Sequence, residues 1–262
     1  MQLEHVVVEP THRRYAAPLL CLHGAWHGAW CWQRAMTDLA ERGFEVHAIS
    51  LRGHGASERA PNHRRSSTRD YGQDLITAVR GFAVPPVIIG HSTGGYLTQL
   101  YLTGVLGEVP PVAGAVLVCS SPVNILRYFI LRRTPPEARV DPRAMLRLEP
   151  ATMQRLFFRP DLPPEQLAHY LSQMVTEPPL IALQSMVLRP RPTANRTPML
   201  VLAAGRDMVF DAEAQAVTAA AYGAELVLVP AAAHDLMLDP DWPVAAAAIE
   251  RFVGQFGSSF TV

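Results

Sequence analysis

One serine of this 262-residue chain lies in a context that could make it a nucleophile. Residues 86–95 read P-V-I-I-G-H-S-T-G-G, so an apolar run leads directly into Gly90-x-Ser92-x-Gly94. This pattern predicts a buried strand, a tight turn and a helix, in which small flanking residues let a strained turn hold the Ser92 hydroxyl out at the strand end. A glycine-rich turn without chemistry is the alternative, but the strand–turn–helix context favours the nucleophile.

A serine hydroxyl is a weak nucleophile unless a base takes its proton, and the base needs a carboxylate to orient it. The apolar run 198–204 is followed by G-R and Asp207, and the run 224–230 is followed by A-A-A and His234. Both residues thus come directly after an expected strand. The chain order Ser92, Asp207, His234 is that of the α/β-hydrolase arrangement and not of the two protease arrangements.

Four other acidic residues lie near this end of the chain and offer alternatives to Asp207 for the carboxylate role: Asp211, Asp235, Asp239 and Asp241. Asp211 is the main rival, although its position suits the start of the following helix. Asp235 is the sequence neighbour of His234 and is poorly placed to bond the ring of that histidine. For His234 itself, the alternative is an ordinary surface-loop histidine.

Two backbone N–H groups are expected to stabilise the negative charge that develops on a carbonyl oxygen during such a reaction. One belongs to Thr93, which follows Ser92 at the start of the expected helix. The other is expected in residues 19–32, L-L-C-L-H-G-A-W-H-G-A-W-C-W. Here Gly24 permits a close approach to the serine, and Ala25 carries the N–H that would point inward.

We expect neither a metal nor an organic cofactor. His23 and His27 are four residues apart, but a loop broken by glycine does not set them on one face, so His23 is expected to orient the loop by hydrogen bonds. All 23 basic residues are arginine. The lack of lysine excludes Schiff-base enzymes, imine-bound pyridoxal phosphate and P-loop nucleotide binding.

The elements that must position these residues follow an alternating pattern of short apolar runs and longer amphipathic segments. This pattern predicts an α/β protein with a mostly parallel, doubly wound sheet. The expected strands are Glu4–Val8, Pro18–Leu22, Phe44–Leu51, Pro86–Gly90, Val112–Ser120, Pro198–Ala204 and Ala224–Pro230. The expected helices are Trp30–Glu41, Tyr71–Phe82, Gly94–Leu106, Asp211–Tyr222 and Trp242–Phe256.

One region interrupts the alternation. Residues 122–197 contain no good strand, and proline pairs such as Pro163-Pro164 and Pro178-Pro179 separate short helical patterns. We interpret this region as a helical cap inserted into a core formed by residues 1–121 and 198–262, because an insertion at the carboxyl edge of a parallel sheet lies where ligands bind. A second subdomain with only a packing role is the alternative.

The chain resembles the α/β-hydrolase superfamily over nearly its whole length. H-G-A-W-H-G-A-W-C-W is similar to the loop H-G-A-C-H-G-A-W-C-W of the plant methylesterase and hydroxynitrile lyase family. Leu51–Ser57, L-R-G-H-G-A-S, is similar to the D-x-R-G-H-G-x-S loop of capped esterases, and H-D-L-M-L-D from His234 looks like their catalytic histidine segment. The resemblance implies an α/β-hydrolase fold with a cap and these roles: Ser92 as nucleophile, Asp207 as acid, His234 as base, and Ala25 and Thr93 as oxyanion donors.

The departures from these families narrow the activity. Hydroxynitrile lyases of this type carry a lysine directly after the catalytic histidine, where this chain has Asp235. Haloalkane dehalogenases and epoxide hydrolases of the superfamily use an aspartate nucleophile, which Ser92 contradicts. Cyanohydrin cleavage, dehalogenation and epoxide opening are therefore not expected.

Composition sets the remaining limits. Net charge is zero, with 23 basic and 23 acidic residues, so there is no electrostatic case for a nucleic-acid partner. No uninterrupted apolar run is long enough to span a membrane, and no signal peptide is visible. Three cysteines are too few for a disulfide framework. These features predict a cytoplasmic protein; its oligomeric state is not readable from the sequence.

The leading hypothesis is a serine esterase that cleaves a small or medium apolar carboxylic ester through an acyl-enzyme. Alternatives on the same triad are a C–C bond hydrolase, a lactonase, a thioesterase or a cofactor-free perhydrolase. The perhydrolase remains an alternative because the segment G-H-S-T-G-G of this chain resembles the serine turn of that group. A ligand receptor on a hydrolase scaffold is the third hypothesis. The candidate substrate contacts are Trp26, Tyr96, Tyr128, Phe129 and Phe157.

Overall fold

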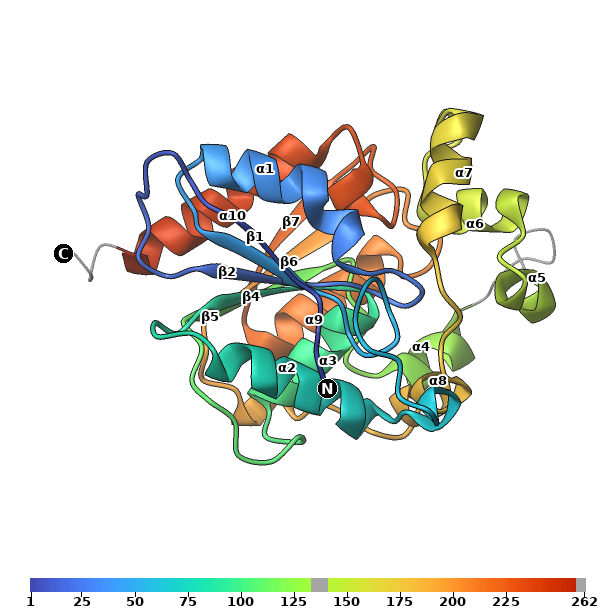
Figure 1. Cartoon of the computed structure of the whole chain (residues 1–262), viewed down its shortest axis with the longest axis horizontal. Helices are drawn as coiled ribbons and strands as arrows, with labels where there is room; N and C mark the ends of the chain where they lie inside the picture. Colours follow the sequence, from blue (N-terminus) through green and yellow to red (C-terminus); the bar gives the residue numbers. More distant parts are fainter. Residues whose placement is uncertain (133–140, 258–262) are drawn as a thin grey trace.

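The computed structural model describes residues 1–132 and 141–257, which contain a seven-stranded sheet with helices on both faces (Figure 1). The strand order is β1-β3-β2-β4-β5-β6-β7. β1 is antiparallel to β3, and every other neighbouring pair is parallel. The predicted mostly parallel, doubly wound sheet is thus confirmed. The strands are β1 (His5–Val8), β2 (Leu19–Leu22), β3 (Val46–Ile49), β4 (Val87–His91), β5 (Gly114–Val118), β6 (Met199–Ala204) and β7 (Glu225–Val229).

The central strands are apolar on both faces because helices cover both faces of the sheet. Every residue of β2, β4, β5 and β6 is buried. β7 lies at the sheet edge, and most of its residues are exposed. The near-continuous apolar runs of the sequence therefore mark β2, β4 and β6, which lead to Ala25, Ser92 and Asp207, whereas His234 follows the exposed edge strand β7.

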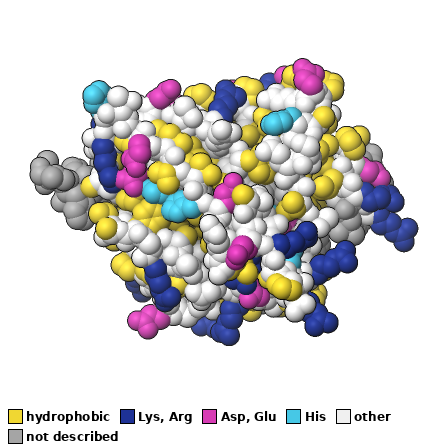
Figure 2. All heavy atoms as spheres, in the orientation of Figure 1, with side chains coloured by type: hydrophobic (Ala, Val, Ile, Leu, Met, Phe, Trp, Pro, Cys, Tyr) yellow, Lys and Arg dark blue, Asp and Glu magenta, His cyan; other side chains and the backbone are white. Residues whose placement is uncertain are grey.

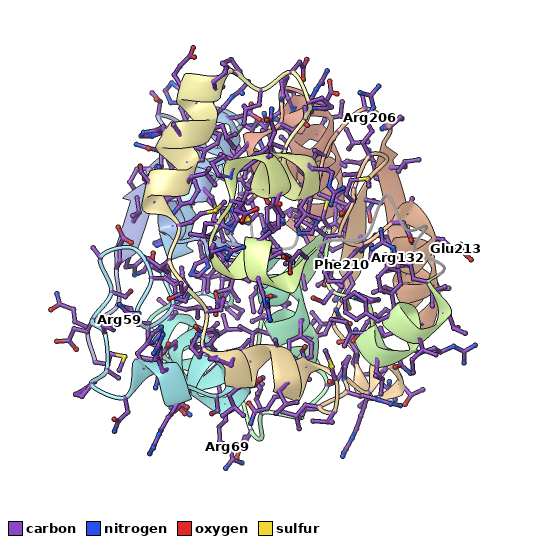
Figure 3. The ribbon with its side chains drawn as sticks, turned by 90° about the vertical axis from the view of Figure 1, so that its right-hand side faces the viewer. Arg59, Arg69, Arg132, Arg206, Phe210 and Glu213 are labelled. Carbon is purple, nitrogen blue, oxygen red and sulfur yellow. The ribbon has the colours of Figure 1, made fainter. Side chains whose placement is uncertain are left out.

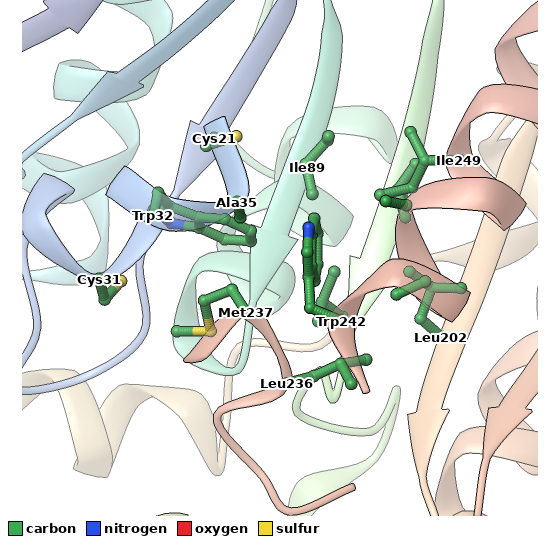
Figure 4. Packing of buried hydrophobic residues seen from close by; sticks show 14 of the residues in the cluster. Cys21, Cys31, Trp32, Ala35, Ile89, Leu202, Leu236, Met237, Trp242 and Ile249 are labelled. Atoms are coloured by element: carbon green, nitrogen blue, oxygen red, sulfur yellow. The ribbon is translucent and has the colours of Figure 1, made fainter. Parts of the chain in front are cut away.

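Helices α1 (Gln33–Glu41) and α10 (Trp242–Gly257) cover one face of the sheet. Helices α2 (Thr68–Arg80), α3 (Thr93–Leu102) and α9 (Ala212–Tyr222) cover the other (Figure 1). Beneath α1 and α10, two buried tryptophans meet edge to face with ring centroids 6.2 Å apart, Trp32 before α1 and Trp242 at the start of α10 (Figure 4). This packing of aromatic surface fixes both helices on the sheet.

Local sequence signals explain where the helices differ from expectation. α2 begins earlier than predicted because Ser67 and Asp70 form a reciprocal capping box. α3 ends earlier than predicted, and Gly104 just beyond it adopts φ +72°. Short 3-10 turns occupy Ala29–Trp32, His63–Arg65, Pro192–Ala194 and Leu236–Leu238.

The chain between β5 and β6 consists of short helices joined by turns and loops, with no strand among its described residues. Its helices are α4 (Ile125–Leu131), α5 (Pro142–Leu146), α6 (Pro150–Phe157), α7 (Pro164–Gln173) and α8 (Pro179–Ser185). Each of α5 to α8 starts with a proline, a residue that suits the first helical position because its missing N–H would have no partner there. These helices gather at one end of the molecule (Figure 1). Residues 133–140 of the expected cap lie outside the described residues.

Basic and acidic side chains are interspersed over the face seen in Figure 2, in keeping with the zero net charge. Over the described ranges, none of the helices has both the length and the apolar character needed to cross a lipid bilayer.

Candidate active site

Ser92 occupies a strained turn between β4 and α3. Its backbone lies at φ 49° and ψ −115°, outside the regions that side-chain-bearing residues normally adopt. The flanking glycines have no room for a side chain. A Cβ on Gly90 would lie 2.5 Å from Thr98 Oγ1, and one on Gly94 would lie 2.5 Å from the His23 carbonyl oxygen. The small residues of the motif are therefore required by the packing around the turn.

His234 is held by Asp207. The Nδ1–H of His234 donates to Asp207 Oδ2 over 2.8 Å, and both side chains are fully buried. The other carboxylate oxygen of Asp207 accepts the backbone N–H groups of Val209 (2.7 Å) and Phe210 (2.8 Å). Nε2 of His234 is buried and has no hydrogen-bond partner among the described residues. A ring in this state carries a lone pair that can accept a proton.

His91 brings the serine turn next to His234. The ring of His91, which directly precedes Ser92, lies with its centroid 4.8 Å from that of His234, and its Nε2–H donates to the His234 carbonyl oxygen over 3.1 Å. Burial, reinforced by His234, lowers the pKa of His91 to about 3, so its ring is neutral. His91 is therefore a neutral spacer between the serine turn and the histidine loop.

The two rival carboxylates have other partners. Asp211 caps α9 by accepting the N–H of Ala214 over 2.9 Å, and it also accepts the Tyr128 hydroxyl over 3.1 Å. Asp235 pairs with His27 Nε2 over 2.9 Å. Of the acids considered from the sequence, Asp207 is the one hydrogen-bonded to the His234 ring.

The loop after β2 passes directly beside the serine. A Cβ on Gly24 would lie 2.9 Å from Ser92 Cβ and 2.8 Å from His91 Nδ1, so the glycine is needed for this approach. The N–H of Trp26 in this loop is already donated to the Glu177 carboxylate over 2.8 Å. Thr93 begins α3, where a helix has N–H groups without a partner inside the helix.

His23 orients this loop, as the sequence predicted. Its Nε2 accepts the N–H of Leu51 over 3.0 Å, so Nδ1 must carry the hydrogen that is donated to the Gly24 carbonyl oxygen over 2.7 Å. Burial lowers the pKa of His23 well below its ordinary value, which keeps the ring in this neutral form.

Aromatic rings pack around the buried His234 ring. The Phe157 ring lies 5.4 Å from the His234 ring and 5.6 Å from that of Trp26, measured between centroids. The Phe210 ring lies 5.9 Å from His234 on another side. Figure 3 shows Phe210 beside Arg132, whose guanidinium donates to the Val209 carbonyl oxygen over 2.8 Å and so joins α4 to the loop after Asp207.

The other candidate contacts do not make a ring contact with His234 among the described residues. Tyr96 is buried in α3 and donates its hydroxyl to the Leu188 carbonyl oxygen over 3.0 Å. Tyr128 packs against Phe210 with centroids 5.8 Å apart. Phe129 is 47% exposed. Of the candidates, Phe157 packs directly against the His234 ring; Trp26 packs against Phe157, and Tyr128 and Phe129 pack against Phe210.

Two residues near the site were missed from the sequence. Phe210 follows Asp207 in an apolar M-V-F run, which is the signal that could have indicated it. Glu177 is an isolated acid in V-T-E-P-P-L, and no periodicity links it to the loop that it contacts.

A pocket of about 560 Å³ opens beside the loops that carry Asp207 and His234. Its walls include residues of α6 together with Arg206 and Ala233, which directly precede Asp207 and His234 in the chain. Phe158 and Met208 add apolar surface, and the pocket does not include Ser92.

Two groups of buried side chains could in principle offer metal ligands. Donor atoms of Cys119, Asp207 and His234 lie within 4.8 Å of one another, and so do those of His91, His234 and Asp235. In the first group, burial and the Asp207 charge raise the pKa of the Cys119 thiol well above its usual value, and Asp207 is already bonded to His234. A protonated thiol is a poor ligand, so this group does not fit a metal.

The sequence pattern of the alpha/beta hydrolase family matches residues 19–246, which is most of the chain. This protein belongs to the alpha/beta hydrolase family. The match includes the segments that contain Ser92, Asp207 and His234.

Named relatives of this alpha/beta hydrolase include plant proteins. It is 30% identical to rice Esterase PIR7B over 124 residues, which are 45% of this chain and 46% of that protein. The matched segment therefore spans less than half of the rice protein. It is 24% identical to pFDCC methylesterase MES16 of Arabidopsis thaliana over 74% of this chain and 78% of that one.

Solved structures share the fold of this alpha/beta hydrolase. A thermophilic esterase from Thermogutta terrifontis superposes with a TM-score of 0.72 at 21% identity, covering 97% of this chain and 94% of that one. At such identity the likeness concerns the fold.

Proposed function

We propose that this protein is a serine hydrolase that cleaves a carboxylic ester of small or medium apolar character. The observation that carries the proposal is the state of His234. Its Nδ1–H is donated to Asp207, its Nε2 is free of partners among the described residues, and its ring stands beside the serine turn. Those are the features of a general base that acts on a serine hydroxyl. The names of the relatives PIR7B and MES16 agree with ester substrates.

In the proposed mechanism, Ser92 Oγ attacks the ester carbonyl carbon while His234 Nε2 takes its proton. Asp207 stabilises the imidazolium that forms. The N–H groups of Ala25 and Thr93 bind the oxyanion; in the loop, Ala25 is preferred to Trp26 because the Trp26 N–H is committed to Glu177. His234 then protonates the alcohol as it leaves, and a water that His234 activates hydrolyses the acyl-enzyme.

Residues 122–197 are proposed to act as the cap over this centre. The Phe157 ring of α6 packs beside those of His234 and Trp26, so this region contributes apolar surface next to the base. Such surface favours an apolar acyl or alcohol group.

The test is hydrolysis of p-nitrophenyl esters from acetate to decanoate by the wild type, Ser92→Ala and the exposed-serine control Ser172→Ala. We expect an optimum at one chain length, a normal rate in the control and loss of at least about 1000-fold in Ser92→Ala. Folded wild type that releases no p-nitrophenol contradicts the ester proposal. Turnover of a lactone or a 1,3-diketone instead would then identify another reaction of the same triad, and no turnover at all would favour a receptor.

A further inference from the structure

The loop of residues 24–27, called here the oxyanion loop, contains a backbone conformation that is unfavourable by itself and needs contacts from the rest of the protein. Trp26 has φ +66°, a region that costs a bulky residue energy and persists only where surrounding contacts impose it. Those contacts come from two distant parts of the chain.

The first part is the segment between α7 and α8. The Glu177 carboxylate accepts the Trp26 N–H over 2.8 Å, and the N–H of Val175 donates to the Trp26 carbonyl oxygen over 2.9 Å. The same carboxylate also accepts from His54 Nε2 over 2.8 Å and from the Tyr71 hydroxyl over 2.9 Å. Three donors thus fix the carboxylate. Burial alone would raise the pKa of Glu177, but His54 and these bonds lower it, so the group is an anion.

The second part is the loop that carries the base. His27 Nδ1 lies 2.6 Å from the Ala25 carbonyl oxygen, and His27 Nε2 lies 2.9 Å from Asp235 Oδ2. Both partners are acceptors, so both ring nitrogens carry hydrogen and His27 is an imidazolium. Burial alone would lower the pKa of His27, but the Asp235 carboxylate outweighs burial and raises it. Asp235 therefore holds Ala25 through a buried, cationic His27.

Both polar groups of the Ala25–Trp26 peptide are therefore hydrogen-bonded: its carbonyl oxygen accepts from His27, which pairs with Asp235, and its N–H donates to Glu177. The preceding peptide is gripped at its carbonyl by His23. Because a trans peptide is planar, with its N–H opposite its C=O, the Gly24 carbonyl held by His23 sets the direction of the Ala25 N–H. The Ala25–Trp26 peptide, held by His27 and Glu177, restricts rotation about the Ala25 backbone bonds and so keeps the Gly24–Ala25 peptide from turning.

We propose that Glu177 and Asp235 are positioning residues that keep the Ala25 N–H directed at the oxyanion of the reacting ester. This inference rests on the proposed esterase function. It gives the insertion a part in the reaction: a side chain of the segment between α7 and α8 completes a donor site formed by the core. Neither carboxylate needs to touch the substrate.

The first experiment compares Glu177→Ala with Glu177→Gln and a matched control, Gln184→Ala. Gln184 is also in the insertion and also accepts a backbone N–H of the core, that of Thr68 over 2.7 Å; the hydrogen bonds found for the oxyanion loop among the described residues do not include Gln184. Each variant is assayed for kcat and KM on p-nitrophenyl butyrate. Each is also assayed for inhibition by an aryl trifluoromethyl ketone, which forms a serine adduct with an oxyanion, and by the methyl ketone analogue, which does not.

Loss of one oxyanion donor typically lowers kcat about 100- to 1000-fold, so a misdirected donor should lower it roughly 10- to 100-fold. We expect that loss in Glu177→Ala with little change in KM. Affinity for the trifluoromethyl ketone should fall by a similar factor, while affinity for the methyl ketone should not change. Glu177→Gln retains an acceptor oxygen for the Trp26 N–H and should recover most of kcat, and Asp235→Ala should resemble Glu177→Ala.

A kcat of Glu177→Ala equal to that of Gln184→Ala overturns the proposal, as does an equal loss of affinity for both ketones. If Glu177→Ala does not fold, Glu177→Asp replaces it, because the shorter side chain keeps the charge but withdraws it from Trp26; an unchanged kcat there has the same meaning. If wild type hydrolyses no ester and binds neither ketone, the esterase function fails instead. The positioning role is then judged by hydrogen exchange of the Trp26 amide, which Glu177→Ala should accelerate and Gln184→Ala should not.

Discussion

Replacing Asp207 with Asn should disable His234 without disturbing the fold. One oxygen of Asp207 accepts two backbone N–H groups, from Val209 and Phe210, and the other accepts from His234 Nδ1. An asparagine of the same shape must choose which side receives its oxygen and which its NH2 group.

The two backbone donors decide that choice. Placing the NH2 group against them would leave two buried N–H groups unsatisfied, at about 1–3 kcal/mol each. The oxygen therefore stays with Val209 and Phe210, and the NH2 group faces His234 Nδ1. Nδ1 must then accept, which puts the ring hydrogen on Nε2, where the lone pair for proton transfer is needed. The same tautomer error lowers kcat about 10⁴-fold in serine proteases, equivalent to about 5.5 kcal/mol.

The assay is kcat on the best p-nitrophenyl ester, with thermal unfolding of each variant. Asp211→Asn is the matched control, because asparagine also caps helices well and the Asp211 carboxylate bonds to Ala214 and Tyr128. We expect a loss of at least about 1000-fold in Asp207→Asn and less than about threefold in Asp211→Asn, at similar unfolding temperatures. A loss below about tenfold in Asp207→Asn, or a larger loss in the control, would refute the assignment of the acid.

Three further perturbations follow from the same geometry. Gly24→Ala introduces a Cβ that would lie 2.9 Å from Ser92 Cβ, so the loop must shift; we expect kcat/KM to fall at least about 100-fold, and a change within threefold would show that the loop approach is not needed. The free energy of unfolding should fall with acidification, because burial holds the pKa of His91 at about 3 in the folded protein. Between pH 6.5 and about pH 3 the His91 ring therefore binds a proton only in the unfolded chain, and this lowers the free energy of unfolding by up to about 1.4 kcal/mol per pH unit. Urea unfolding at pH 7, 6 and 5 measures how the free energy of unfolding depends on pH. The variant His91→Gln should reduce this dependence by the contribution of one proton, and an unchanged dependence contradicts a neutral His91 ring. Phe157→Leu enlarges the space beside His234, and the preferred acyl chain should lengthen; an unaltered chain-length profile would mean that Phe157 does not contact the substrate.

The sequence alone could predict those parts of the site that local backbone chemistry dictates. The turn at Ser92 needs small residues on both sides because the chain reverses within van der Waals contact of its neighbours. These residues are close together in the sequence, so the motif can be recognised without the structure. The buried strands can likewise be predicted from the sequence, because a strand covered on both faces must be apolar throughout. The placement of Asp207 after β6 and of His234 after β7 then follows from the common edge of a parallel sheet.

The choice among carboxylates was decided by the tertiary structure. Asp207, Asp211 and Asp235 lie in loops or at a helix start, where no periodicity gives the direction of a side chain. Backbone donors orient Asp207, a helix end engages Asp211, and His27 takes Asp235. Sequence distance could rank these acids but could not assign their partners.

The support of the oxyanion loop depended most on the tertiary structure. Glu177 is 151 residues from Trp26, and Asp235 is 208 residues from His27. A buried carboxylate is stable only where donors converge on it, and such convergence is a property of loops brought together by the whole fold. The sequence by itself determined the fold and the expected reacting residues; the folded chain determined which groups hold the loop beside them, because that requires contacts between segments that no local pattern connects.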